Sequence, residues 1–351
     1  MMNTDDEDKA PAESAAAEPA GRETPRRSRG RRVLVAVLCV VTVLIGAGCV
    51  TWYSLMRVAP ASSPDAYVDI RAGDAVSDIS ARLHAMGMTT NDRSLGWYWR
   101  LKGGGSLREG RYVVGGAASM ADLYQILAVG QPLTVRVTFP EGYTVQQMAA
   151  RLAEQAGIPA RDFMAAAVDG RGALLEGQLF PDTYDVLYAG EAAAVVARMQ
   201  RRLDEVLPSD WQAAATRHGL TTDQLLTVAS IVEREAKFDA DRPLVASVIY
   251  NRLRAGMLLQ MDATLGYVLP SHDGFYTGDE LTFDSPYNTY VHAGLPPTPI
   301  CNPGLASIEA AAHAPQTSYL YFLARPDGHC VFARTYAEHE RNIRLYLSGG
   351  S

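Results

Sequence analysis

The sequence predicts an α+β protein with a single membrane-spanning helix near its N-terminus. Three observations support this fold class: an uncharged apolar run at residues 33–56, a pattern of short strand, glycine turn and helix that recurs after it, and strong helix-start signals in the second half. Together they predict a small α+β region, followed by a larger region of mixed helices and strands.

The first part of the chain differs in composition from the rest. Residues 1–32 contain almost no large apolar side chain, which predicts a disordered cytoplasmic tail. The run at 33–56 contains no charge and would span roughly 36 Å as a helix, enough to cross a hydrocarbon core about 30 Å thick. Arginines cluster between Arg26 and Arg32, so the positive-inside bias predicts a cytoplasmic N-terminus and an exported remainder.

Two other interpretations of this run stay open. Small residues at Ala59–Ala61 are compatible with a cleaved signal peptide, and Cys49 with a lipoprotein, although Gly46 stands where a lipoprotein would have a large aliphatic residue. The run is longer than the apolar region of a signal peptide, which is typically about 7 to 15 residues. This length favours an uncleaved single-pass anchor.

Charge and cysteine content narrow the functional classes. The net charge is -7 and no basic stripe lies outside the N-terminal tail, which argues against a nucleic-acid partner. Cys39 and Cys49 fall in the apolar run, whereas Cys301 and Cys330 could form a disulfide in an oxidising compartment. The cysteine spacing does not match a zinc site, and the sequence contains no His-Glu-x-x-His motif that would bind a metal. We therefore expect no metal and no cofactor.

After a Pro-, Ala- and Ser-rich linker at 57–66, the strand-turn-helix pattern occurs at 67–87, 112–131 and 137–157. Residues 67–133 resemble a small LysM-like module of the kind that binds carbohydrate, and the Trp97–Trp99 cluster offers rings for stacking on sugars. The same residues fit a spacer domain without a ligand, in which the cluster is half-buried packing.

The remaining residues, 134–351, form the predicted mixed α/β domain. Residues 160–207 are predicted to be mostly helical, with an interruption at 175–186. A capping box at Thr221 and Gln224 starts one helix, and a second helix at 242–255 ends at Gly256. Near the C-terminus we expect a hairpin that turns at Asp327 and Gly328, and a last helix capped by Thr335 and Glu338.

The helix that begins at Thr221 contains ASIVEREA, with two carboxylates in an apolar context. On a helical wheel, Glu233 and Glu235 fall on the two flanks of the apolar arc. Apolar neighbours favour a protonated carboxyl, and a protonated carboxyl is what a glycosidic oxygen needs as a proton donor. Alternatively, each glutamate pairs with Lys237 or with an arginine of the next helix. The wheel does not distinguish the two glutamates.

Two further segments are the least core-like parts of the second half. One is QMDAT at 260–264, and the other is the proline-rich stretch at 286–304, which can form neither a helix nor a central strand. A rigid loop that carries Tyr287, Asn288, Thr289 and Tyr290 suits a sugar-binding cleft. A proline-stiffened surface loop without function is the alternative.

These motifs together carry a specific resemblance. ASIVEREA, VASVIYNRL, GMLLQMDAT, SPYNTY with GLPPTPICNPG, and EGQLFPDTYDV stand in the order and spacing of the membrane-anchored endolytic murein transglycosylases, the MltG or YceG-like family. The resemblance covers residues 67–347 and the anchor. Met261 and Ala263 depart from the family pattern, which often has Thr and Pro at these positions. The Pro-Asp-Thr-aromatic turn that ends at Tyr184 is interpreted as structural.

The resemblance implies an inner-membrane lyase whose catalytic domain, residues 134–351, lies outside the cytoplasm and cuts nascent peptidoglycan strands internally. It assigns the catalytic role to Glu233, leaves Glu235 as an ion-pair or framework residue, and places substrate contacts on Gln260, Asp262 and Tyr287–Tyr290, with Gln260 and Asn288 orienting the sugar or the acid. The partners that it implies are glycan strands, the membrane and peptidoglycan synthesis enzymes.

The same resemblance implies a mechanism with one carboxyl group. Glu233 would protonate the leaving oxygen of the MurNAc–GlcNAc β-(1→4) bond, and its conjugate base would take the proton of the C6 hydroxyl that closes a 1,6-anhydro ring. No water would be consumed. The alternative is a non-catalytic, membrane-tethered peptidoglycan adaptor, whose affinity would lie in residues 67–133.

Overall fold

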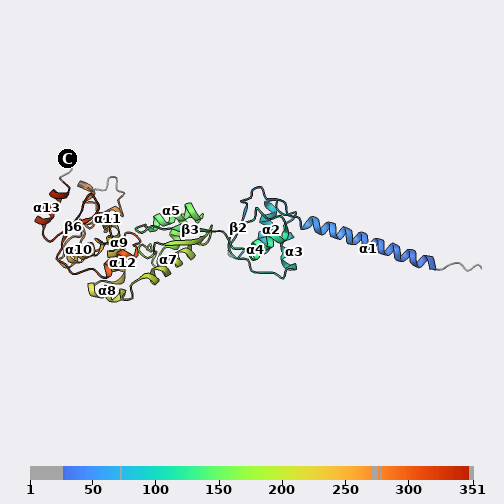
Figure 1. Ribbon diagram of the computed structural model, residues 1–351, viewed down its shortest axis with the longest axis horizontal. Helices are drawn as coiled ribbons and strands as arrows, with labels where there is room; N and C mark the ends of the chain where they lie inside the picture. Colours follow the sequence, from blue (N-terminus) through green and yellow to red (C-terminus); the bar gives the residue numbers. More distant parts are fainter. Residues whose placement is uncertain (1–26, 72, 270–275, 277, 348–351) are drawn as a thin grey trace, which may run out of the picture. The chain divides into compact units, whose positions relative to one another are not determined.

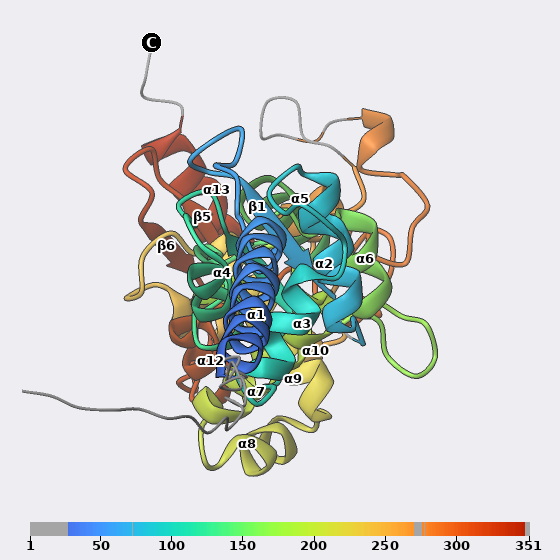
Figure 2. The same ribbon diagram turned by 90° about the vertical axis from the view of Figure 1, so that its right-hand side faces the viewer.

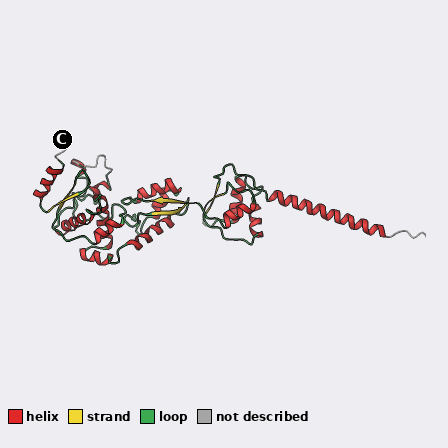
Figure 3. Ribbon diagram, in the orientation of Figure 1, coloured by secondary structure: helices red, strands yellow, loops and turns green. Residues whose placement is uncertain are grey.

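The structure is a computed structural model that describes residues 27–71, 73–269, 276 and 278–347. Its contacts divide the chain into two units, Met1–Arg57 and Val58–Ser351. Helices predominate, and the strands form three separate antiparallel pairs (Figure 3). The mixed α/β character predicted from the sequence is confirmed.

The first unit consists of one long helix, α1 (Arg27–Leu55), drawn in blue in Figures 1 and 2. Residues Gly30–Leu55 are long and apolar enough to cross a membrane, with a mean hydropathy of 2.9, although a signal sequence near an N-terminus would meet the same test. Residues 27–32, expected to be disordered, are helical, because arginine is a good helix former and continues the apolar helix backwards. The rest of the predicted tail lies outside the described residues.

The second unit begins with a small α+β module. Strands β1 (Tyr67–Ile70) and β2 (Gly110–Val113) pair antiparallel, and α2 (Val76–Ala85) and α3 (Ser94–Leu101) lie between them in the chain. Helix α4 (Met120–Ala128) follows, with a hydrogen bond from the Asp122 N–H to the Ser119 side chain at its cap. The first two predicted strand-turn-helix units are therefore confirmed.

A second antiparallel pair forms the middle of this unit. Strands β3 (Thr134–Thr138) and β4 (Thr183–Leu187) pair in register from Thr134 opposite Leu187. Helices α5 (Val145–Ala156), α6 (Ala160–Ala166) and α7 (Ala192–Val206) enclose one core with them, whose buried side chains include Phe139, Met148, Leu152, Phe163 and Met199. The third strand-turn-helix unit, β3 with α5, is confirmed.

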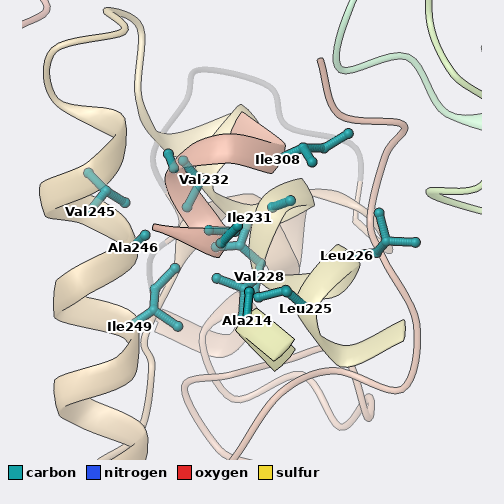
Figure 4. Close-up of a cluster of buried hydrophobic side chains, with 14 of the residues drawn as sticks. Ala214, Leu225, Leu226, Val228, Ile231, Val232, Val245, Ala246, Ile249 and Ile308 are labelled. Carbon is teal, nitrogen blue, oxygen red and sulfur yellow. The ribbon is translucent and has the colours of Figure 1, made fainter. Parts of the chain in front are cut away.

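The remaining helices surround α9 (Thr222–Glu235). They are α8 (Trp211–His218), α10 (Arg242–Arg254), α11 (Asp262–Gly266) and α12 (Leu305–Ala312), and a 3₁₀ turn lies at Gly278–Glu280. Figure 4 shows apolar side chains of α8, α9, α10 and α12 that meet in this core. Residues 225–232 of α9 are buried on every side, including Thr227 and Ser230, so the polar arc of the wheel does not face water there.

The chain ends with the hairpin β5 (Tyr321–Ala324) and β6 (Cys330–Ala333), followed by α13 (Tyr336–Tyr346), which packs against it. The capping boxes at Thr221 and Thr335 and the left-handed Gly256 after α10 confirm the predicted helix limits. Cys301 and Cys330 are both free, so the disulfide does not form; Cys301 is buried and its thiol donates to the Ser230 carbonyl oxygen at 3.4 Å.

Candidate active site at the end of helix α9

The last turn of α9 carries both glutamates, and their surroundings differ sharply. Glu235 is the final residue of the helix, because Ala236 is extended, with φ -105° and ψ 114°. Glu233 and Glu235 are two positions apart, so their side chains leave the helix on different sides. Glu233 contacts α10 and α12, whereas Glu235 contacts α11.

Glu233 is held by three hydrogen-bond donors. Its Oε2 accepts from Arg242 Nη1 at 3.0 Å, from the Gly304 N–H at 3.0 Å and from the Ser307 hydroxyl at 2.8 Å. Its side chain is only 8% exposed, and that of Arg242 is 9% exposed. Glu233 therefore forms a buried, fully supported ion pair that joins α9, α10 and the start of α12. The sequence had favoured Glu235 for this framework role.

Glu235 has a different environment. Its Oε1 accepts one hydrogen bond, from the Ala263 N–H at 3.1 Å, and none of the residues that the structure describes forms an ion pair with it. The pKa of Glu235 is raised to about 7, mainly by burial and also by the nearby negative charge of Asp262, while the hydrogen bond from the Ala263 N–H and the charges of Arg234 and Arg252 oppose the shift. A carboxyl group with this pKa is protonated in a large share of molecules near neutral pH.

Helix α11 brings one group of predicted site residues to Glu235. Asp262 Oδ1 accepts from the Tyr290 hydroxyl at 2.5 Å, and burial, with Asp262 beside it, raises the pKa of Tyr290. The Gln260 side chain is exposed, and its backbone, left-handed at φ 49°, donates to the Thr289 carbonyl oxygen at 3.0 Å. Glu235, Asp262 and Tyr290 thus form one connected group, with Gln260 at its edge.

The other predicted loop residues mainly hold the loop together. Asn288 is fully buried; its amide donates to the carbonyl oxygens of Leu281 and Phe283, and its Oδ1 accepts from the Tyr290 N–H. Thr289 is also buried, and its hydroxyl accepts from the Met261 N–H at 3.0 Å. Because these groups are used inside the protein, they fix the position of Tyr290.

Tyr287 lies on the other side of the loop. Its hydroxyl bonds to the Thr298 hydroxyl at 2.7 Å, and its ring packs at 4.9 Å, centroid to centroid, on the ring of Tyr267. It is partly buried. Tyr287 therefore stiffens the loop and links it to the residue that follows α11.

Three residues outside the predicted site shape this region, and one of them, Arg242, belongs to the next helix, whose arginines were considered as partners for a glutamate. Arg242 and Ser307 support Glu233, and Arg252 is 7% exposed, with its guanidinium donating to the carbonyl oxygens of Leu259 and Leu320. Burial lowers the pKa of Arg252. A buried arginine in a helix has no distinctive sequence pattern, because a solvent-facing arginine would produce the same one.

The fold and the site define a mixed α/β protein with a carboxyl group of raised pKa at the end of a buried helix. Residues 68–345 match the model of the YceG-like family, so the chain belongs to that family. A protein of Bacillus subtilis (strain 168), named endolytic murein transglycosylase, is 29% identical over 330 residues, which cover 87% of this chain and 92% of that protein.

Two more proteins are similar over most of the chain. A protein of the same name from Streptococcus pneumoniae serotype 2 (strain D39) is 27% identical over 365 residues, 90% of this chain and 66% of that protein. A 2.6 Å crystal structure of a yceG-like protein from Listeria monocytogenes has a TM-score of 0.54 and 31% identity, over 79% of this chain and 98% of that one.

Proposed function

We propose that this protein is an endolytic murein transglycosylase, a lyase that cleaves glycan strands of peptidoglycan internally. Its membership of the YceG-like family and the names of its relatives support this class of activity. The observation that carries the chemistry is the carboxyl group of Glu233, which three donors hold through Oε2, so that Oε1 is the oxygen left for a substrate.

The proton donor in this proposal is Glu233, the residue that the sequence resemblance indicated. Arg242, the Gly304 N–H and the Ser307 hydroxyl all bind its Oε2, which fixes the carboxyl group where α9, α10 and α12 meet. Glu235 is the alternative, because its pKa is raised to about 7 and the predicted substrate residues Asp262 and Tyr290 lie near it. The matched variants described below distinguish the two glutamates.

The proposed reaction needs one carboxyl group. Glu233 donates its proton to the leaving oxygen of the MurNAc–GlcNAc β-(1→4) bond, and the C6 hydroxyl of the same MurNAc attacks the anomeric carbon. The Glu233 carboxylate then takes the proton of that hydroxyl, which leaves a 1,6-anhydroMurNAc end and restores the acid. Most glycosidases need a second carboxylate as nucleophile or base, and the substrate hydroxyl takes its place here.

The substrate contacts in this proposal are Gln260, Asp262, Tyr287 and Tyr290, with Asn288 and Thr289 supporting the loop. The exposed Gln260 amide is suited to bind a ring hydroxyl. Asp262 lies beside Glu235, whose pKa its negative charge helps to raise. Tyr290 holds Asp262 in place through its hydroxyl.

The test is product analysis with matched glutamate variants. The detergent-solubilised full chain is incubated with uncrosslinked glycan strands, and the products are weighed by mass spectrometry. We expect anhydroMurNAc ends, a loss of about 100-fold or more in Glu233→Gln, as for removal of a general acid, and retained cleavage in folded Glu235→Gln. Reducing MurNAc ends would refute the lytic mechanism, and an active Glu233→Gln with an inactive but folded Glu235→Gln would move the role to Glu235.

We also propose that α1 anchors the protein in the inner membrane as a single pass, with residues 134–351 acting outside the cytoplasm near peptidoglycan synthesis enzymes. The length and apolar character of Gly30–Leu55 support an anchor, and the preceding arginines support a cytoplasmic N-terminus.

For residues 67–133 we propose a LysM-like module that binds glycan. The order β1, α2, α3, β2 and a pocket of about 390 Å³ support this assignment. The pocket is lined by the 42% exposed Trp97, by Trp99 and by Arg93 and Arg100. Trp97→Ala should weaken retention on glycan strands severalfold without changing folding; unchanged retention would leave this module as a spacer.

A further inference from the structure

The loop between β3 and α5 brings a further carboxyl group, that of Glu141, to the end of α9. Two backbone hydrogen bonds fix this loop: the Gly142 N–H donates to the Asn302 carbonyl oxygen at 2.9 Å, and the Asn302 N–H donates to the Tyr143 carbonyl oxygen at 2.9 Å. A Cβ atom at Gly142 would lie 3.6 Å from Cγ of Glu233. The loop therefore packs directly on the proposed acid.

Gly304 is the residue that both carboxyl groups contact. Its N–H donates to Glu233 Oε2 at 3.0 Å, and a Cβ atom at the same position would overlap the carboxyl group of Glu141. The backbone of Gly304 is extended, with φ -79° and ψ 170°, a conformation that any residue adopts. The close approach of Glu141, and not the backbone conformation, therefore favours glycine here.

Glu141 brings a negative charge to this site without a partner of its own. Among the residues that the structure describes, none forms an ion pair or a hydrogen bond with its carboxyl group, and the nearby Arg242 donates instead to Glu233 and Asp239, at 3.0 Å each. Burial and the charge of Glu233 raise the pKa of Glu141, Arg242 lowers it, and Asp239 raises it. Three carboxyl groups thus share one arginine.

The contacts of Glu233 explain why such a neighbour matters. Arg242, the Gly304 N–H and the Ser307 hydroxyl all donate to Glu233, and donors and positive charges favour the carboxylate, whereas a general acid must carry a proton. A second carboxylate has the opposite effect, because two like charges in one site are unfavourable. The interaction is mutual, so the charge of Glu141 favours the proton on Glu233.

We propose that Glu141 is a positioning residue that acts through Glu233: its carboxylate keeps the proton on Glu233 until the glycosidic oxygen takes it. This inference rests on the proposed function, in which Glu233 is the acid. Glu141 itself neither gives nor takes a proton in the reaction. The other charged or titratable groups beside Glu233 stay in place when Glu141 is changed; they are Arg234 of α9, Asp239 and Arg242 at the start of α10, and the Cys301 thiol before α12.

Glu141→Gln is the first test, because it removes the charge and keeps the shape of the side chain. Gly304→Ala is the second, because its Cβ displaces the Glu141 carboxyl group while its N–H still donates to Glu233. The matched control is Glu154→Gln, the same substitution at an exposed position of α5. All variants are made in the detergent-solubilised full chain, and kcat/KM on uncrosslinked glycan strands is measured from pH 4 to 9, with thermal unfolding alongside.

We expect the fall of kcat/KM at high pH to move to lower pH by about one unit in Glu141→Gln, because Glu233 then loses its proton more easily. The rate should be about tenfold below wild type on the high-pH side and within about 2-fold on the low-pH plateau, where Glu233 is protonated in both proteins. Gly304→Ala should shift the profile in the same direction, and the double variant no further than Glu141→Gln. Glu154→Gln should keep the wild-type profile.

Three results would overturn the inference: an unchanged pH profile in Glu141→Gln, a rate lowered equally at every pH, or the same shift in Glu154→Gln. A purely structural role of Glu141 would give the second result. Wild type and Glu233→Gln are measured in the same assay. If Glu233→Gln cleaves normally, the proposed acid is wrong; if it is inactive while Glu141→Gln keeps the wild-type profile, only the role of Glu141 has failed.

Discussion

Glu233 and Glu235 differ in what surrounds their carboxyl groups, although they are two positions apart on one helix. Three donors and an arginine hold Glu233. Glu235 has one backbone donor, a neighbouring carboxylate and a pKa of about 7. Neighbours that are distant in sequence therefore assign the two side chains different tasks.

The raised pKa of Glu235 gives a second way to distinguish the two glutamates. If Glu235 donated the proton, kcat/KM would be constant below about pH 6 and fall as the pH rises through about 7, approaching tenfold per unit. With Glu233 as the donor, we expect Glu235→Gln to keep the activity and the pH profile of the wild type. Initial rates of both proteins between pH 5 and 9 measure this, and an inactive but folded Glu235→Gln would contradict it.

The same pKa shift predicts how stability changes with pH. A carboxyl group whose pKa is raised from 4.5 to about 7 on folding makes the native state less stable as the pH rises through that range. Glu235→Gln removes this cost, so we expect it to raise the free energy of unfolding by about 3 kcal/mol at pH 8 and by almost nothing at pH 4. Urea unfolding at both pH values measures the difference; equal effects at the two pH values would contradict it.

At the scale of elements, the ion pair of Glu233 with Arg242 joins α9 to α10, and the Gly304 and Ser307 donors join it to α12. Removing one member of a buried pair leaves the other charged and unsupported, which typically costs 3–5 kcal/mol.

We therefore expect Arg242→Met to lower the free energy of unfolding at pH 7 by about 3 kcal/mol, and Arg242→Met with Glu233→Gln to recover part of that loss. Denaturant unfolding measures both variants. Arg202→Met is a control, because Arg202 pairs with Asp182 at a site where both side chains are about 40% exposed. A loss no larger than that of the control would mean that the pair does not brace α9.

Local sequence signals predicted the elements well, whereas the site depended on contacts between distant segments. The capping box at Thr221 predicted where α9 starts, because a cap acts within four residues. The wheel placed both glutamates beside apolar neighbours but could not show that Gly304 and Ala263 would donate to one each. Asn288 has the chemistry of a ligand-binding residue, yet its amide binds the loop's own backbone.

At the scale of the whole molecule, the division after Arg57 predicts two separable parts. We expect the full chain to remain in the membrane fraction with its N-terminus intact and to need detergent for extraction. A fragment that begins at Val58 should be soluble and cleave free glycan strands within about 2-fold of the full chain, because its contacts are internal. Fractionation and intact mass of the full chain test the anchor, and a protein that lacks its first residues would contradict it. Solubility and the rate assay test the fragment, and an insoluble or inactive fragment would contradict the division.

The point at which α9 ends has an electrostatic consequence of its own. Aligned peptide dipoles give a helix a partial negative charge at its C-terminus and a partial positive charge at its N-terminus. Glu235 is the last residue of α9, where the dipole disfavours a carboxylate, whereas Glu233 contacts Gly304 and Ser307 at the start of α12, where the dipole favours one. A variant that extended α9 by one turn would move the negative end of the helix away from Glu235 and lower its pKa.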